Sequence, residues 1–387
     1  MKKVTLLLWF TAIIGLFLYS FTQIDLNLII SRFAPIYTLE QIFQSIGYFN
    51  RPLSTILYLI LLILLFIGYW FFWILARRRM LSEKEFWLII IFSCLILLFS
   101  YPAFSYDIYN YMFDAKTIVF YHQNPWIVRP LYFSTDPWLN FMHWTHRPTV
   151  YPPFWILLTL PLYFFSFNIF IIALLYFKSL MALGYIVSIY VMKKLLMKTQ
   201  GNKYLPQLVF YAFNPLLLIE FLVSGHNDII MMFFALISLL MLIKNRKMSS
   251  FIVLILSILI KYMTFVLIPI FVARSFINRK LSDKRVFQLS FLCLVVGLAV
   301  SIVKMEIQPW YYIWVFPFMI LSGWNFFWPI SVGLAFGLLL RYLPFLFFGN
   351  WDNPIPLYKT WLTLVPFLIS IGISFIVVIN RRKNKHA

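Results

Sequence analysis

Carboxylates bracketed by proline and aromatic residues open a polar stretch between residues 103 and 150. Beside a bilayer, such groups are typical of a reaction or binding site at the membrane face. Asp107 and Asp114 stand seven residues apart, with Asn110 and Tyr111 between them. This spacing predicts one helix face with the carboxylates roughly 10 Å apart, so two separate roles are expected. The alternative is an amphipathic helix at the interface with its polar face in water.

A second polar group, Ser-Gly-His-Asn-Asp over residues 224–228, separates two apolar runs. Helix capping by Asn227 or Asp228 is one explanation. Capping accounts for one polar residue, but not for three consecutive ones that follow Glu220 in an apolar run. His226, Asn227 and Asp228 are therefore candidate binding residues.

The histidines of the sequence neither establish nor exclude a metal site. A zinc site needs three or four ligands in good geometry, and the spacing of His122, His143, His146 and His226 is not diagnostic. No cofactor is therefore assigned, and a divalent cation stays an open alternative. The two cysteines, Cys94 and Cys293, lie in apolar runs and indicate packing.

Cations in or beside apolar runs are candidates for binding a phosphate. Lys261 lies in the middle of ILSILIKYMTFVLIP, whereas a lysine reaches the membrane surface most easily from a helix end. At a helix break its ammonium could meet a phosphate instead. Arg147 and, with a weaker case, Arg129 are similar candidates, whereas Lys178 could be a buried partner or a snorkelling group.

The elements that position these groups are membrane helices. The chain has 387 residues, of which 63% are hydrophobic and 11% charged, against about 25% charged residues in soluble domains. Many apolar runs approach the roughly 20 residues that a spanning helix needs. We therefore expect a single polytopic membrane domain over residues 1–387, with residues 103–150 as a large outer loop that carries the site.

The net charge of +20 predicts orientation and does not indicate nucleic-acid binding. Of the 32 Lys and Arg residues, 22 lie in six short clusters at the ends of apolar runs, the pattern of cytoplasmic loops. We expect a cell-membrane protein with both termini cytoplasmic and the site on the outer face. The clusters are Lys2-Lys3, Arg77 to Lys84, Lys193 to Lys203, Lys244 to Lys247, Arg274 to Arg285, and Arg381 to Lys385.

If all six basic clusters lie on the cytoplasmic side, the sequence predicts an all-α fold of about 12 membrane-spanning helices, with a range of 10–13. Residues 151–166 predict a half-inserted outer segment, and residues 250–275 predict two half-length helices that meet near Lys261. Such irregular backbone is tolerated only beside a cavity, here one that opens on the outer face. The predicted helices are 4–21, 53–76, 86–102, 168–192, 206–222, 228–243, 250–260, 262–275, 286–303, 310–322, 328–346 and 356–380.

At these residues the chain resembles the GT-C glycosyltransferases that use polyprenol-phosphate-linked sugars. The likeness is strongest to the bacterial polyprenol-phosphomannose-dependent and GPI-type mannosyltransferases. The chain departs from the family's pattern in one respect, since it has no strict Asp-x-Asp motif. Five segments carry the resemblance in the family's order: Tyr106-Asp107-Ile108-Tyr109 to Asp114-Ala115, Asn124-Pro125-Trp126, Tyr151-Pro152-Pro153, Gly225-His226-Asn227-Asp228 after Asn214-Pro215, and Pro309-Trp310-Tyr311.

The resemblance implies hexose transfer, with mannose favoured, from a polyprenol-phosphate donor to a glycolipid or cell-envelope glycan, with inversion. Asp107 would be the base that deprotonates the acceptor hydroxyl. Lys261, Arg147 and His226 would stabilise the departing phosphate. The other substrate-binding residues would be Asn110, Tyr111, Asp114, Tyr151, Asn227 and Asp228.

Two alternatives share the polytopic architecture. A transporter or flippase of lipid-linked sugars predicts repeat symmetry and acids near mid-membrane. A polysaccharide polymerase or ligase predicts a large outer loop late in the chain, whereas the large loop here is early.

Overall fold

The computed structural model describes residues 1–26, 28, 33–277 and 280–386. Within these ranges every regular element is a helix, which confirms the all-α prediction for the described chain. Arg279 of the fifth basic cluster, and residues 27 and 29–32 of the outer loop predicted over 22–52, lie outside the described residues.

Six stretches of helix in the described ranges are long and apolar enough to cross a membrane. A bent pair of helices makes a possible seventh span, so the chain is a multi-pass membrane protein. The long helices are α1 (Lys2–Ser20), α3 (Arg51–Arg77), α7 (Phe170–Gln200), α13 (Asp283–Lys304), α15 (Phe327–Leu340) with α16 (Leu343–Phe348), and α17 (Ile355–His386).

The count of about twelve spans is not established by these helices. The five other predicted helices have counterparts in the described chain, but these are too short to count as spans by length. Twelve crossings therefore stay a prediction. The shorter helices are α4 (Glu83–Leu98), α10 (Asp228–Ile243), α11 (Lys247–Ile258), α12 (Ile268–Val272) and α14 (Tyr312–Ser322).

Two breaks in the helices have local causes. The helix predicted over 206–222 is instead α8 (Leu205–Ala212) and α9 (Pro215–Leu217), bent by 44°. Proline starts a helix well but cannot continue one, so the chain turns at Pro215. The break predicted near Lys261 is confirmed, since Lys261 has an extended backbone between α11 and a 3-10 helix over Tyr262–Leu267.

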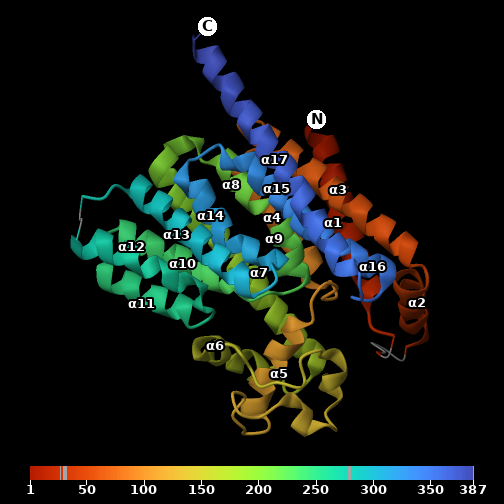
Figure 1. Ribbon diagram of the computed structural model, residues 1–387. Coiled ribbons are helices and arrows are strands. Elements are labelled where there is room, and N and C mark those ends of the chain that lie inside the picture. Colours follow the sequence, from red (N-terminus) through yellow and green to blue (C-terminus); the bar gives the residue numbers. More distant parts are fainter. Residues whose placement is uncertain (27, 29–32, 278–279, 387) are drawn as a thin grey trace.

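The helix predicted from the spacing of Asp107 and Asp114 is present, and the segment 151–166 contains a short helix whose half-insertion stays a prediction. Figure 1 shows the two chain ends at one end of the bundle and α5 (Asp107–Val119) with α6 (Pro153–Phe164) at the opposite end. A further helix, α2 (Ala34–Gln44), follows the first span. Residues 108–117 of α5 are buried, so the amphipathic helix with a solvated face is wrong.

Short 3-10 and π turns connect or extend these helices. The π turn over Leu218–Val223 continues α9 and carries Glu220. The remaining turns are Phe21–Gln23, Ser45–Phe49, Pro130–Phe133, Pro137–Phe141, Gly201–Lys203, Ala273–Ile277 and Pro309–Tyr311.

Candidate active site

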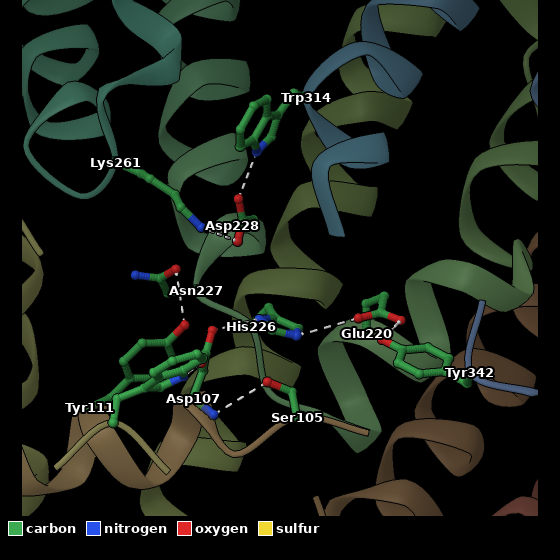
Figure 2. Close-up of polar contacts among 11 residues, drawn as sticks. Ser105, Asp107, Tyr111, Glu220, His226, Asn227, Asp228, Lys261, Trp314 and Tyr342 are labelled. Atoms are coloured by element: carbon green, nitrogen blue, oxygen red, sulfur yellow. Dashed lines mark hydrogen bonds and ion pairs between the residues drawn. The ribbon is translucent and has the colours of Figure 1, made fainter. Parts of the chain in front are cut away.

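Asp107 is the first residue of α5 and the most accessible acid of the site (Figure 2). Its side chain is 19% exposed, so an acceptor hydroxyl can reach it. One carboxylate oxygen, Oδ1, accepts a hydrogen bond from Trp144 Nε1 at 3.3 Å. Burial raises the pKa of Asp107, and the positive charge of Lys261 opposes this shift. A carboxylate with a raised pKa is better matched to proton abstraction near neutral pH.

His226 faces Asp107 from the loop that precedes α10. Its Nδ1 atom lies 3.6 Å from Asp107 Oδ2, and its ring stacks on Trp310 with 3.8 Å between centroids. The imidazole is fully buried, and burial, followed by the charge of Lys261, lowers its pKa. His226 is therefore neutral at neutral pH, and the prediction that it stabilises phosphate by charge is not supported by its surroundings.

Glu220 closes a row on the far side of the imidazole. Its Oε2 atom lies 3.4 Å from His226 Nε2, and its Oε1 atom accepts a hydrogen bond from the Tyr342 hydroxyl at 2.9 Å. Figure 2 shows Asp107, His226, Glu220 and Tyr342 in line. The carboxylate is fully buried in a π turn, a feature that recurs at functional sites.

A neutral imidazole carries one N–H and can donate to only one carboxylate at a time. Neither ring nitrogen of His226 makes a hydrogen bond of good geometry, although both face a carboxylate oxygen. Small movements on substrate binding can therefore decide whether Asp107 or Glu220 receives this N–H. The row can orient Asp107 for proton abstraction.

Both carboxylate oxygens of Asp228 accept hydrogen bonds from other protein groups. Its Oδ2 atom accepts from Lys261 Nζ at 2.8 Å and its Oδ1 atom from Trp314 Nε1 at 2.6 Å. The carboxylate is fully buried, whereas the Lys261 side chain is 25% exposed. Asp228 thus fixes the ammonium of Lys261, which keeps two of its three N–H donors for a ligand.

The capping explanation for Asn227 is not what the structure shows. Asn227 precedes α10, but its side chain makes no capping hydrogen bond. Its Oδ1 atom instead accepts from the Tyr111 hydroxyl at 3.3 Å, which joins this loop to α5. Tyr111 in turn meets the Tyr151 ring edge to face at 4.9 Å, so these three predicted residues come together.

Asp114 lies two turns after Asp107 on α5 and is more deeply buried. Its Oδ2 atom accepts from the Thr149 hydroxyl at 2.7 Å, and burial raises its pKa to about 7. Asn110, one turn earlier, donates to the Trp144 carbonyl at 3.1 Å. The Arg147 guanidinium lies over the Trp144 ring at 4.4 Å, and Trp144 is the residue that donates to Asp107. These groups line a narrow crevice with Tyr151.

The described residues contain no group of three or more His, Cys, Asp or Glu side chains arranged to hold a metal ion. Four of the sequence-predicted candidates form two centres, the Asp107–His226 contact and the Asp228–Lys261 ion pair. The crevice residues Asn110, Asp114, Arg147 and Tyr151 form a third group. Glu220 was noticed in the sequence but given no role. Trp310 was part of a family-like segment but was given no role, and the residues that were missed are Trp144, Trp314 and Tyr342.

A sequence model of the MptA/B family, described as "Alpha-(1->6)-mannopyranosyltransferase, N-terminal domain", matches residues 29–276, more than half of the chain. The chain belongs to this mannosyltransferase family. No curated protein and no solved structure matches it. The family match confirms the resemblance seen in the sequence. In this mannosyltransferase the matched region includes Asp107, His226 and Lys261, whereas Trp310 and Tyr342 come from the part beyond it.

Proposed function

We propose that the protein transfers mannose from a polyprenol-phosphate donor to a hydroxyl of a glycolipid or cell-envelope glycan, forming an α-(1→6) linkage. The observation that carries this proposal is the contact of the partly exposed Asp107 with the neutral His226, beside the cations Lys261 and Arg147. The family supplies the sugar and the linkage. In our proposal both termini are cytoplasmic and the site faces outward.

The chemistry is a single displacement at the anomeric carbon. Asp107 takes the proton of the acceptor hydroxyl while the hydroxyl oxygen attacks C1 of the mannosyl group. The bond between C1 and the phosphate oxygen breaks, and its electron pair leaves with polyprenyl phosphate. Attack opposite the leaving group inverts the configuration at C1. A phosphate already leaves well, so no strong general acid is needed.

The surrounding residues take distinct parts in this proposal. Lys261 and Arg147 stabilise the departing phosphate, an effect that is largest where water is scarce. His226 and Glu220 orient Asp107, and Asp228 positions Lys261. A bound divalent cation, which the proposal does not require, would help to neutralise the charge of the phosphate. Sugar and acceptor hydroxyls would meet Asn110, Tyr111, Asp114, Tyr151 and Asn227.

The test measures transfer of radiolabelled mannose from polyprenol-phosphate-linked mannose. It uses membranes that contain the wild type, Asp107→Asn or Asp352→Asn. Asp352 is an exposed acid outside the site and serves as the matched control. Loss of the base lowers the rate by about 10²–10⁴-fold, and the control keeps the wild-type rate. An active Asp107→Asn protein contradicts the assignment of the base. A wild type that transfers neither mannose, glucose nor galactose to a broad acceptor extract rejects the proposed reaction.

A further inference from the structure

A large groove lies away from the candidate active site, between α3, α8, α15 and α17. Its volume is about 1340 Å³, more than the roughly 300–1,000 Å³ of most small-molecule pockets. Phe66, Trp70, Phe336 and Ile369 line its apolar part. Trp70 and Ile369 are more than half exposed, so the groove opens sideways, toward the surrounding lipid.

The groove belongs to the end of the bundle that carries the chain termini. Lys2 pairs with Glu85 at the start of α4, and Glu83 accepts from Lys193 and Tyr204, next to the groove residue Lys203. Figure 1 shows this end opposite α5. A helix of 27 residues such as α3, which ends at the rim residue Arg77, is roughly 40 Å long and can span a membrane.

Every charged side chain that lines the groove is a cation. Arg77, Arg79 and Lys203 line it, and no acidic side chain is among its lining residues. The Arg77 guanidinium also lies over the Trp73 ring at 4.8 Å. Tryptophan and arginine side by side are typical of the membrane–water interface, where lipid headgroups lie. The charge of the rim therefore complements an anionic headgroup.

The length of the groove corresponds to one leaflet. From Phe66 to Arg77 the helix α3 rises by roughly 16 Å, about half of the roughly 30 Å hydrocarbon core. A neighbouring apolar hollow of about 570 Å³ shares Phe66, Trp70 and Phe336 and extends the apolar surface along α3. An acyl chain that starts at the cationic rim would thus lie on apolar side chains along its length.

Polar atoms without protein partners lie between the rim and the apolar part. Among the described residues that line the groove, Trp73 Nε1, Trp328 Nε1 and Gln207 Oε1 are buried and have no hydrogen-bond partner. Buried polar groups normally have a partner. The walls of the groove near the rim therefore contain polar side chains as well as apolar ones.

We propose that this groove binds one anionic phospholipid of the leaflet on the side of the chain termini. The phosphate lies among Arg77, Arg79 and Lys203, and the acyl chains lie along Phe66, Trp70 and neighbouring apolar residues of α15 and α17. Basic pockets between helices on the cytoplasmic side recognise anionic headgroups in this way. The site does not depend on the proposed reaction at Asp107.

The proposal is tested on the purified full chain in detergent, by native mass spectrometry and thermal unfolding with added dioleoyl phosphatidylglycerol or phosphatidylcholine. The test variant is Arg77→Gln/Arg79→Gln/Lys203→Gln. The matched control, Arg78→Gln/Lys194→Gln/Lys244→Gln, removes three exposed cations that do not line the groove. A third variant, Val332→Trp, fills the apolar part without a change of charge.

We expect one phosphatidylglycerol to bind the wild type and the control and to raise their unfolding temperature more than phosphatidylcholine does. Each cation contributes about fivefold, so the test variant binds roughly 100-fold more weakly. Val332→Trp lowers the affinity for both lipids. Equal binding of the two lipids, or an equal loss in the control, overturns the proposal. Tighter binding of polyprenyl phosphate than of phosphatidylglycerol, or a dimer that covers the groove, assigns it to another occupant.

Discussion

The Nδ1 atom of His226 lies 3.6 Å from Oδ2 of Asp107, and this contact joins the loop before α10 to the first turn of α5. His226 is held on its other faces by Trp310 and by Glu220. The imidazole therefore has one orientation, and that orientation presents a ring nitrogen to the carboxylate proposed as the base. Asp107 thus faces a residue that cannot itself touch solvent.

Replacement of His226 by glutamine is expected to lower kcat by about 10²-fold, because small displacements of a catalytic group have effects of this size. Residues that act as a unit are not additive, so Asp107→Asn/His226→Gln is expected to be no slower than Asp107→Asn. Steady-state mannose transfer measures both. His122→Asn, a change in an exposed histidine with positive φ, is the control. Fully additive losses would show that His226 acts independently of Asp107.

The ion pair of Lys261 with Asp228 predicts a charge-specific loss of stability. Lys261→Met leaves the fully buried Asp228 carboxylate with the Trp314 N–H as its one remaining side-chain donor among the described residues. Breaking a buried pair costs roughly 3–5 kcal/mol, and the 25% exposure of the Lys261 side chain places this pair at the lower end. Lys261→Met/Asp228→Asn is expected to recover most of the loss in equilibrium unfolding. No recovery would mean that the lysine stabilises the fold through its packing alone.

The candidate site was predictable where unusual residues interrupt apolar runs. Asp107, His226 and Asp228 were found because ionisable groups beside a membrane are costly. The break near Lys261 followed instead from keeping the basic cluster Arg274 to Arg285 on the cytoplasmic side, and the structure confirms it. Both signals can be read from residue types along the chain.

Partners that come from distant segments left no such signal. Tyr342 lies between α15 and α16 and contacts Glu220 where α15 packs beside α9, and no neighbouring residue in the sequence indicates this contact. Trp310 and Trp314 lie in one aromatic stretch of the sequence and were given no role, yet Trp310 stacks on His226 and Trp314 donates to Asp228. The bend at Pro215 was missed because the apolar run continues through it.

Asp114 predicts a pH-dependent stability. Burial raises the pKa of its carboxyl to about 7 in the folded protein, against about 4 in an unfolded chain. Between these values the unfolded chain loses the proton and the folded protein keeps it, so this group lowers stability as the pH rises from about 4 to about 7. Asp114→Asn is expected to make the unfolding temperature depend less on pH over this range. The exposed Asp352→Asn keeps the wild-type slope, and an unchanged slope in Asp114→Asn would refute the assignment.

Gly225 predicts a loss that combines backbone strain with a clash. Its φ is +78°, and a Cβ atom there would lie 2.7 Å from Cδ1 of Ile108 on α5. Left-handed backbone costs a residue with a Cβ roughly 1–2 kcal/mol. Gly323 has a φ of +70° with no atom within 4 Å of its Cβ position, so Gly323→Ala measures the strain without the clash.

Gly225→Ala is therefore expected to destabilise the protein more than Gly323→Ala does, in unfolding measured by thermal melts. It is also expected to lower mannose transfer, because the clash pushes the His226 loop away from α5 and from Asp107. Shortening the opposing side chain in Gly225→Ala/Ile108→Val removes Cδ1 and is expected to restore activity while the backbone strain stays. If the double variant stays as slow as Gly225→Ala, the approach of the loop to α5 is not what positions His226.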